Sequence, residues 1–467
     1  MHIVVLAAFA VVRLLAEMRI LLLASRGLAV GIVAAYLAGA VILARIASQA
    51  AMESAVASPR RGLSTGKPLL RLLTHLWLLG GLACISVTSY GQWMFSGPPS
   101  QIPLAATVGA MLPFFAAVVA GWIVEYPAHR AFRLRLVGQN PPGEPQPAGP
   151  LSLGQYVLLN TRHELLFIAA PVGMLVLLGD VLSIYVEPAL SPRVAPWVML
   201  PMMFAGMGGV FIIAPAVIVK VWSTEPLGSG PLRESLEKMA RMLGVRFRRM
   251  LIWRSGGVII NAAVVGLLGR FRYVLLSDAM LRQMPQREIE AVFAHEAQHI
   301  AGHHIFYGTM LILSLSLAIT GASELLRLKL GWGSWGVDAA GLMLLAAALY
   351  VAFGWVSRRL ERQCDVHAAK TAGALQGSDG DQDVVSQEGA AIFAMALQRV
   401  AQLNAISPLQ RNWRHGSIHW RISHVLDVAS AGKGTGDIDR LVRRIKLCLW
   451  AGFVCSCALV GWAALSG

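Results

Sequence analysis

Residues 295–299 read His-Glu-Ala-Gln-His, within a stretch, 287–304, whose pattern predicts a helix. Two histidines four positions apart share one helix face, with side chains about 5–6 Å apart. That spacing suits two ligands of one tetrahedral zinc ion. Glu296 lies one step round the helix, where its carboxylate can take a proton from a metal-activated water without ligating the metal. The motif therefore predicts a catalytic zinc centre; the alternative is a polar amphipathic helix whose histidines only form hydrogen bonds.

The rest of the chain is strongly apolar. Of its 467 residues, 56% are hydrophobic and only 14% are charged, a balance typical of membrane proteins. Apolar runs long enough to cross a bilayer predict transmembrane helices, and the clearest are 27–47, 72–94, 103–124, 165–186, 197–221, 305–325, 337–356 and 446–465. The shorter run 1–16 fits an interfacial helix, an extra span or a signal-like segment. We expect it to be retained, since no convincing small-residue cleavage site follows.

The net charge of +15 is distributed unevenly between the loops. Basic residues gather in alternate loops and in the two polar segments, 222–304 and 357–445, whereas the opposite loops carry few of them. This is the positive-inside asymmetry of membrane proteins, and it places both polar segments in the cytoplasm. Because topology accounts for the positive charge, we expect no nucleic-acid partner.

The alternation of apolar and polar segments predicts the domain organisation. We expect a mainly α, multi-pass helical membrane protein with a small α+β zinc domain on the cytoplasmic side. Its parts are 1–221, an N-terminal membrane domain of about five spans; 222–304, the first part of the zinc domain; 305–356, a transmembrane hairpin; 357–445, the second part of the zinc domain; and 446–467, a final span. Within the zinc domain we expect helices at 232–243, 278–284 and 390–405, and strands at 248–253, 258–265 and 273–276.

A catalytic zinc usually has three protein ligands and one open position, so the motif needs a third ligand. A metzincin would have its third histidine where Ile305 stands, and His303 is out of register. An intramembrane protease of the site-2 type would carry an Asp-Gly pair in a later apolar run, which this sequence lacks. We expect His303 and His304 to be interfacial residues rather than ligands.

The segment 357–365, Ser-Arg-Arg-Leu-Glu-Arg-Gln-Cys-Asp, offers a better third ligand. The hairpin 305–356 returns the chain to the same side of the membrane, so Glu361 can reach the two histidines. Asp365 shares its helix face and can bind the other nitrogen of a ligand histidine. Alternatively, Glu361 is a solvated acid that neutralises neighbouring arginines, and Cys364 is expected only to pack.

Together these segments resemble the membrane zinc endopeptidases of the type I CAAX prenyl protease group and their bacterial heat-shock relatives, the gluzincins of peptidase family 48. The specific motifs cover roughly 261–422. The resemblance implies a gluzincin-type protease domain in which His295, His299 and Glu361 bind one catalytic Zn²⁺. It also implies that Glu296 is the general base and acid.

Two further motifs carry the resemblance. Asn261, Ala262 and Ala263, followed by Gly266, resemble the family's substrate-binding edge strand. The run 414–418, Arg-His-Gly-Ser-Ile, with Arg421 and Ile422, resembles its late histidine motif, although glycine replaces the family's common proline at position 416. By this resemblance, His415 would donate a hydrogen bond to the oxyanion of the tetrahedral intermediate.

We therefore expect a multi-pass zinc endopeptidase of the inner cell membrane, with its active site facing the cytoplasm. Its partners would be the lipid bilayer and a peptide or membrane-protein substrate. One alternative is a non-proteolytic membrane scaffold or transporter with a degenerate zinc site, against which the intact Glu296 argues, because a structural zinc has no use for a base. Another is a sensor whose protease domain transmits a signal, against which the absence of an obvious external domain argues.

Overall fold

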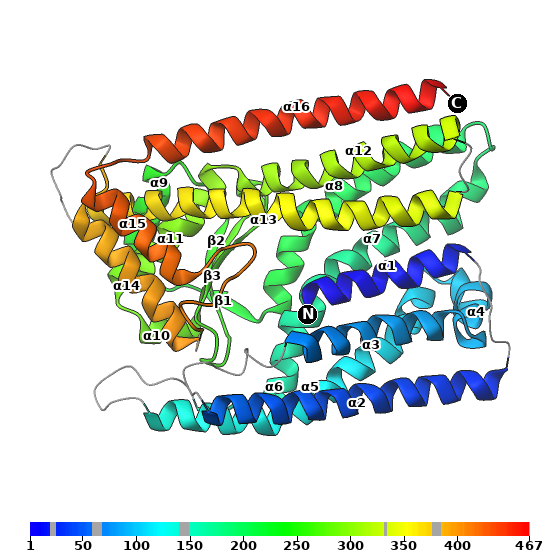
Figure 1. Ribbon diagram of the computed structural model, residues 1–467, viewed down its shortest axis with the longest axis horizontal. Helices are drawn as coiled ribbons and strands as arrows, with labels where there is room; N and C mark the ends of the chain where they lie inside the picture. Colours follow the sequence, from blue (N-terminus) through cyan, green and yellow to red (C-terminus); the bar gives the residue numbers. More distant parts are fainter. Residues whose placement is uncertain are drawn as a thin grey trace. The chain divides into compact units, whose positions relative to one another are not determined.

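A computed structural model describes residues 1–18, 25–57, 68–139, 149–330, 334–375, 384–404 and 406–466 (Figure 1). The chain divides into two compact units. The first contains residues 1–226, 248–259 and 270–279, and the second contains residues 227–247, 260–269 and 280–467.

Among the described residues, seven helices are long and apolar enough to cross a membrane. They cover Arg26–Glu53, Ala105–Arg135, Leu153–Ala189, Trp197–Val221, His304–Lys329, Ala340–Leu375 and Gly436–Ala463. Together with a few short strands, they confirm the predicted fold class, a mainly α multi-pass membrane protein with a small sheet.

The first unit is a helical bundle with three short strands. Its helices are α1 (His2–Met18), α2 (Arg26–Ala57), α3 (Pro68–Ser86), α4 (Ser89–Ser96), α5 (Ala105–Gln139), α6 (Leu153–Asn160), α7 (Phe167–Val181) and α8 (Ala195–Val221). Helix α1 packs against α3, α5 and α7 and buries Val5, Ala8 and Val12 completely. Its Arg13 pairs with Asp180 at 3.0 Å between Nη1 and Oδ1. The apolar run 1–16 is thus part of this unit's core.

The predicted span 72–94 is two helices rather than one. Helix α3 ends at Ser86, and α4 starts at Ser89 after Thr88, whose hydroxyl accepts a hydrogen bond from the backbone N–H of Tyr90. The two helices meet closely at Gly91, where an added Cβ would lie 1.9 Å from the backbone oxygen of Ser86. A threonine cap and a close approach of two backbones therefore break the run without a proline.

Replacing Gly91 with alanine is expected to destabilise the first unit by about 1–3 kcal/mol, because the new methyl group overlaps backbone atoms that cannot move freely. Thermal unfolding in detergent measures the effect. Gly80→Ala is the matched control, since nothing lies within 4 Å of its added Cβ. Equal melting temperatures for the two variants would contradict this account of the break.

The strands of the first unit are β1 (Thr224–Pro226), β2 (Arg249–Trp253) and β4 (Tyr273–Ser277). Strand β1 pairs antiparallel with β2, and β2 pairs parallel with β4, with Leu251 opposite Leu275. Gly256 and Gly257 both take positive φ, at 69° and 76°, in the turn that follows β2. The carboxylate of Asp278 holds that turn by accepting hydrogen bonds from the backbone of Ser255 and Gly257.

The strand predicted at 258–265 is shorter than expected, because β3 covers only Ala262–Val265. The backbone just before it bonds to a side chain instead of to another strand. The Asn404 amide accepts from the N–H of Ile260 and donates to its carbonyl oxygen, at 3.1 and 2.8 Å. A Val- and Ile-rich run therefore forms a strand over only its second half.

The second unit carries β3 and the helices α9 (Pro231–Met242), α11 (Gln286–Ala301), α12 (His304–Leu330), α13 (Ser334–Leu375), α14 (Gln387–Leu403), α15 (Ile418–Ser430) and α16 (Gly436–Ser466). The short α10 (Asp278–Gln283) precedes α11 in the chain. Helices α12, α13 and α16 lie side by side (Figure 1). Helix α13 runs unbroken for 42 residues, from its membrane-spanning part into the polar segment. At that polar end it packs against α11 and α14.

Candidate metal centre

Helix α11 carries the His-Glu-Ala-Gln-His motif and is buried along most of its length. Its first turn is tied to α14 by an ion pair between Glu288 Oε2 and Arg399 Nε, 2.6 Å apart. The Phe393 ring of α14 stacks against the imidazole of His295, with ring centroids 6.0 Å apart. These contacts fix the helix that presents both histidines.

The prediction that this helix continues to residue 304 is wrong. Helix α11 ends at Ala301, His303 takes the left-handed conformation with φ 54°, and α12 starts at His304. A Cβ on Gly302 would lie 2.3 Å from Nε2 of His304, so glycine leaves the room for that ring. The break leaves His303 exposed and His304 buried inside the protein.

The structure brings the three predicted zinc ligands together. The Nε2 atoms of His295 and His299 are 3.3 Å apart. Glu361 places Oε2 3.4 Å from His295 Nε2, and it places Oε1 3.5 Å from His299 Nε2. A tetrahedral zinc with ligand bonds of about 2.0–2.1 Å needs ligand atoms about 3.3–3.4 Å apart. The donor set therefore fits one zinc ion in chemical type and in spacing.

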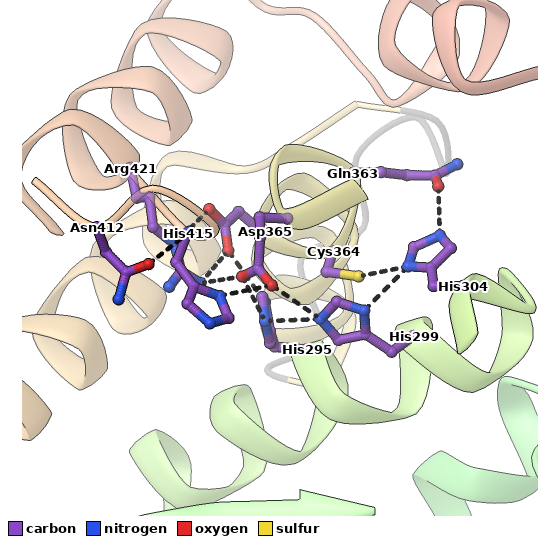
Figure 2. Close-up of polar contacts among 10 residues, drawn as sticks. His295, His299, His304, Gln363, Cys364, Asp365, Asn412, His415 and Arg421 are labelled. Atoms are coloured by element: carbon purple, nitrogen blue, oxygen red, sulfur yellow. Dashed lines mark hydrogen bonds and ion pairs between the residues drawn. The ribbon is translucent and has the colours of Figure 1, made fainter. Parts of the chain in front are cut away.

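The buried Asp365 and the partly buried Arg421 form an ion pair beside His295 (Figure 2). Oδ1 of Asp365 lies 3.0 Å from Nδ1 of His295. The Arg421 guanidinium donates two hydrogen bonds to the same carboxylate, at 2.9 and 2.6 Å. Burial acts to lower the pKa of Arg421, but the Asp365 carboxylate outweighs it and raises the pKa above its usual value. The sequence alone does not predict this role for Arg421. The only indication of a role is its position in the late histidine motif.

Three residues of α11 have altered proton affinities. Burial acts to lower the pKa of His295, but the carboxylates of Asp365 and Glu361 outweigh it and raise the pKa to about 9. Burial raises the pKa of the Glu296 carboxyl, which His295 only partly opposes. Burial and the neighbouring His295 hold the pKa of His299 well below its usual value. A neutral imidazole is the form that binds zinc, and a carboxylate with a raised pKa is a stronger base.

His415 also contacts the ligand carboxylate, because its Nδ1 lies 2.8 Å from Oε1 of Glu361. The turn that carries it is held by Asn412, whose side-chain oxygen accepts from the backbone N–H groups of Arg414 and His415. Gly416 follows with φ 79°, which proline cannot adopt. The glycine at this position is therefore required by the turn in this chain.

A cavity of about 410 Å³ is lined by the three predicted ligands, His295, His299 and Glu361. Its walls include Glu296 and His415, apolar side chains of α14 such as Phe393 and Leu397, and the β3 segment. Of the predicted substrate-strand residues, Asn261 lines the cavity, whereas Ala262 and Ala263 do not. Val264 lines it in their place.

Several known proteins are similar to this chain in sequence or in structure. Residues 226–409 match the model of peptidase family M48. A Protease HtpX homolog from Desulfotalea psychrophila is 25% identical over 240 residues, which cover 44% of this chain and 78% of that protein. Protease HtpX from Xylella fastidiosa is 27% identical over 154 residues, which cover 30% of this chain and 53% of that protein. The crystal structure of S. mikatae Ste24p aligns over 85% of this chain and 97% of that one, with a TM-score of 0.47 and 16% identity.

The family match covers α11 and the polar end of α13, and with them His295, Glu296, His299 and Glu361. His415 and Arg421 lie beyond its last residue.

Proposed function

We propose that this chain, whose residues 226–409 match the model of peptidase family M48, is a membrane zinc endopeptidase that hydrolyses peptides or membrane-protein segments. The observation that carries the proposal is the spacing of 3.3–3.5 Å between the ligand atoms of His295, His299 and Glu361. Glu296 lines the cavity beside them.

In this proposal, His295, His299 and Glu361 hold one Zn²⁺, which when bound acidifies a water molecule and polarises the substrate carbonyl. Glu296 takes the proton of the attacking water and passes it to the leaving amine. The Asp365 carboxylate, 3.0 Å from Nδ1 of His295, favours the proton on that nitrogen and so leaves Nε2 free to act as the ligand atom. His415 donates a hydrogen bond to the oxyanion that forms at the attacked carbonyl.

We also propose that substrate binds as an extended strand beside β3. Asn261 and Val264 lie on the cavity wall next to the ligands. An extended peptide can gain main-chain hydrogen bonds by adding itself to a strand, while pockets receive alternate side chains. The apolar walls formed by α14 favour hydrophobic side chains in those pockets.

The basic loops support a further part of the proposal, namely that this site faces the cytoplasm from the inner cell membrane. The polar segments that carry the ligands are rich in lysine and arginine. Substrates would then be cytoplasmic peptides or the cytoplasmic parts of membrane proteins.

Removal of zinc tests the proposed function. The purified protein in detergent is expected to cleave casein and an unfolded membrane protein. Treatment with 1,10-phenanthroline should abolish cleavage, and added Zn²⁺ should restore it, because all the proposed chemistry needs the ion. Metal analysis should find one zinc per chain. Unchanged cleavage by protein shown to be free of metal would refute the proposal.

A further inference from the structure

A buried chain of hydrogen-bonding groups leads away from the proposed zinc ligand His299 (Figure 2). Its Nδ1 lies 3.0 Å from Nδ1 of His304, the first residue of α12. Nε2 of His304 lies 3.0 Å from Oε1 of Gln363 on α13. The amide nitrogen of Gln363 donates in turn to Oδ1 of Asp439 on α16, at 2.5 Å. His304 and Gln363, in the middle of this chain, are only 5% and 7% exposed, so little water reaches the contact between them.

The end of this chain fixes the direction of every hydrogen bond in it. An ionised carboxylate can only accept, so the NH₂ group of Gln363 must face Asp439 and its carbonyl oxygen must face His304. His304 therefore donates from Nε2 and presents a lone pair at Nδ1. That lone pair can accept only if His299 carries its proton on Nδ1, which leaves Nε2 of His299 unprotonated and facing Glu361.

Two contacts hold the α16 end of this chain in place. His367 on α13 lies 3.0 Å from Oδ1 of Asp439. The Lys446 ammonium on α16 donates to the backbone oxygen of Gly302, at 2.8 Å, in the break between α11 and α12. Helix α16 is therefore bound to the histidine chain and to the turn that orients it.

We propose that His304 and Gln363 are positioning residues for the metal centre, and that together with Asp439 they set the tautomer and orientation of His299. The inference rests on the zinc site proposed above. Each proposed ligand histidine then has its own polar partner. His295 has the Asp365 carboxylate, and His299 has the imidazole of His304, which Gln363 connects to Asp439 on α16. Removal of a partner of this kind typically lowers metal affinity roughly 10–100-fold.

A second metal site is the competing explanation for the same cluster. One ring nitrogen of His299, one of His304 and Sγ of Cys364 also lie within 4.8 Å of one another. The sulfur is 3.5 Å from Nδ1 of His304. If His304 and Gln363 position His299, the protein binds one zinc ion and the Cys364 thiol has no role. A second site requires two metal ions per protein molecule and depends on the thiol.

The test measures zinc affinity of the metal-free full-length protein in detergent, by competition with a chromophoric chelator. His304→Leu is expected to weaken zinc binding roughly 10–100-fold, and His304→Asp should recover most of the loss, because a carboxylate again accepts from Nδ1–H. Gln363→Leu should weaken binding less. Cys364→Ala, which removes the other buried neighbour of His304, should leave affinity unchanged. The cobalt-substituted protein should show an altered visible spectrum in His304→Leu only.

Each failure points to a different statement. Wild-type zinc affinity in His304→Leu, together with loss of zinc in Glu361→Ala, overturns the positioning chain and leaves the proposed function standing. Two zinc ions per chain, one of them lost in Cys364→Ala, overturn it in favour of a second site. No zinc binding by the wild-type protein removes the proposed function and this inference together. Melting curves of the metal-free variants show whether a variant has lost zinc because it is misfolded. His304→Asp and Gln363→Leu test the same contacts independently of His304→Leu.

Discussion

Glu296→Gln is expected to retain its zinc and to lose about 10²–10⁴-fold in peptide hydrolysis, the usual contribution of a positioned general base. Glutamine has nearly the same shape as glutamate but cannot take a proton from water. The side chain lines the cavity and is not one of the three clustered ligands, so the metal should stay bound. The measurement pairs zinc content with the rate of casein cleavage.

Glu388→Gln is the matched control, because this exposed glutamate lies in the first turn of α14 and lines none of the described cavities. It should cleave at the wild-type rate. Equal cleavage by wild type and Glu296→Gln would show that another group is the base, whereas loss of zinc from Glu296→Gln would show that the carboxylate ligates the metal.

Glu361→Ala is expected to bind zinc far more weakly, by more than the roughly 10–100-fold loss typical when the hydrogen-bonding partner of a ligand is removed. The substitution removes one of the three predicted ligands and leaves His295, His299 and Arg421 without the carboxylate that they contact. Zinc affinity is measured by chelator competition, and hydrolysis should fall with zinc occupancy.

His303→Ala is the control for this prediction. His303 is exposed, lies four residues from His299, and is not one of the residues lining the described cavities. Its loss should leave zinc affinity unchanged. Normal zinc binding by Glu361→Ala with weak binding by His303→Ala would move the third ligand to His303.

The sequence predicted the parts of the site that depend on local spacing. Residues four apart on a helix share a face, so His295 and His299 could be paired without a structure. Glu361 was found because a hairpin of two spans returns the chain to its starting side. The meeting of these three side chains in the structure agrees with that reasoning, while their role as ligands stays a prediction.

The sequence did not predict features that depend on side chains far apart in the chain. Nothing local marks Arg421 as the partner of Asp365, 56 residues away, or Asp439 as the partner of Gln363, 76 residues away. The sequence does not predict the helix break after Ala301, because no proline marks it. The strand at 258–265 was overextended because the Asn404 amide takes the place of a neighbouring strand.

The continuity of α13 has a mechanical consequence. An α-helix is stiff over a few tens of ångströms, and α13 has 42 residues at a rise of about 1.5 Å each. Glu361 lies within the candidate span Ala340–Leu375, on the same helix as the apolar part of that span. We expect a tilt that a thicker or thinner bilayer imposes on α13 to displace the Glu361 carboxylate relative to the two imidazoles, so that bilayer thickness affects the geometry of the proposed metal site.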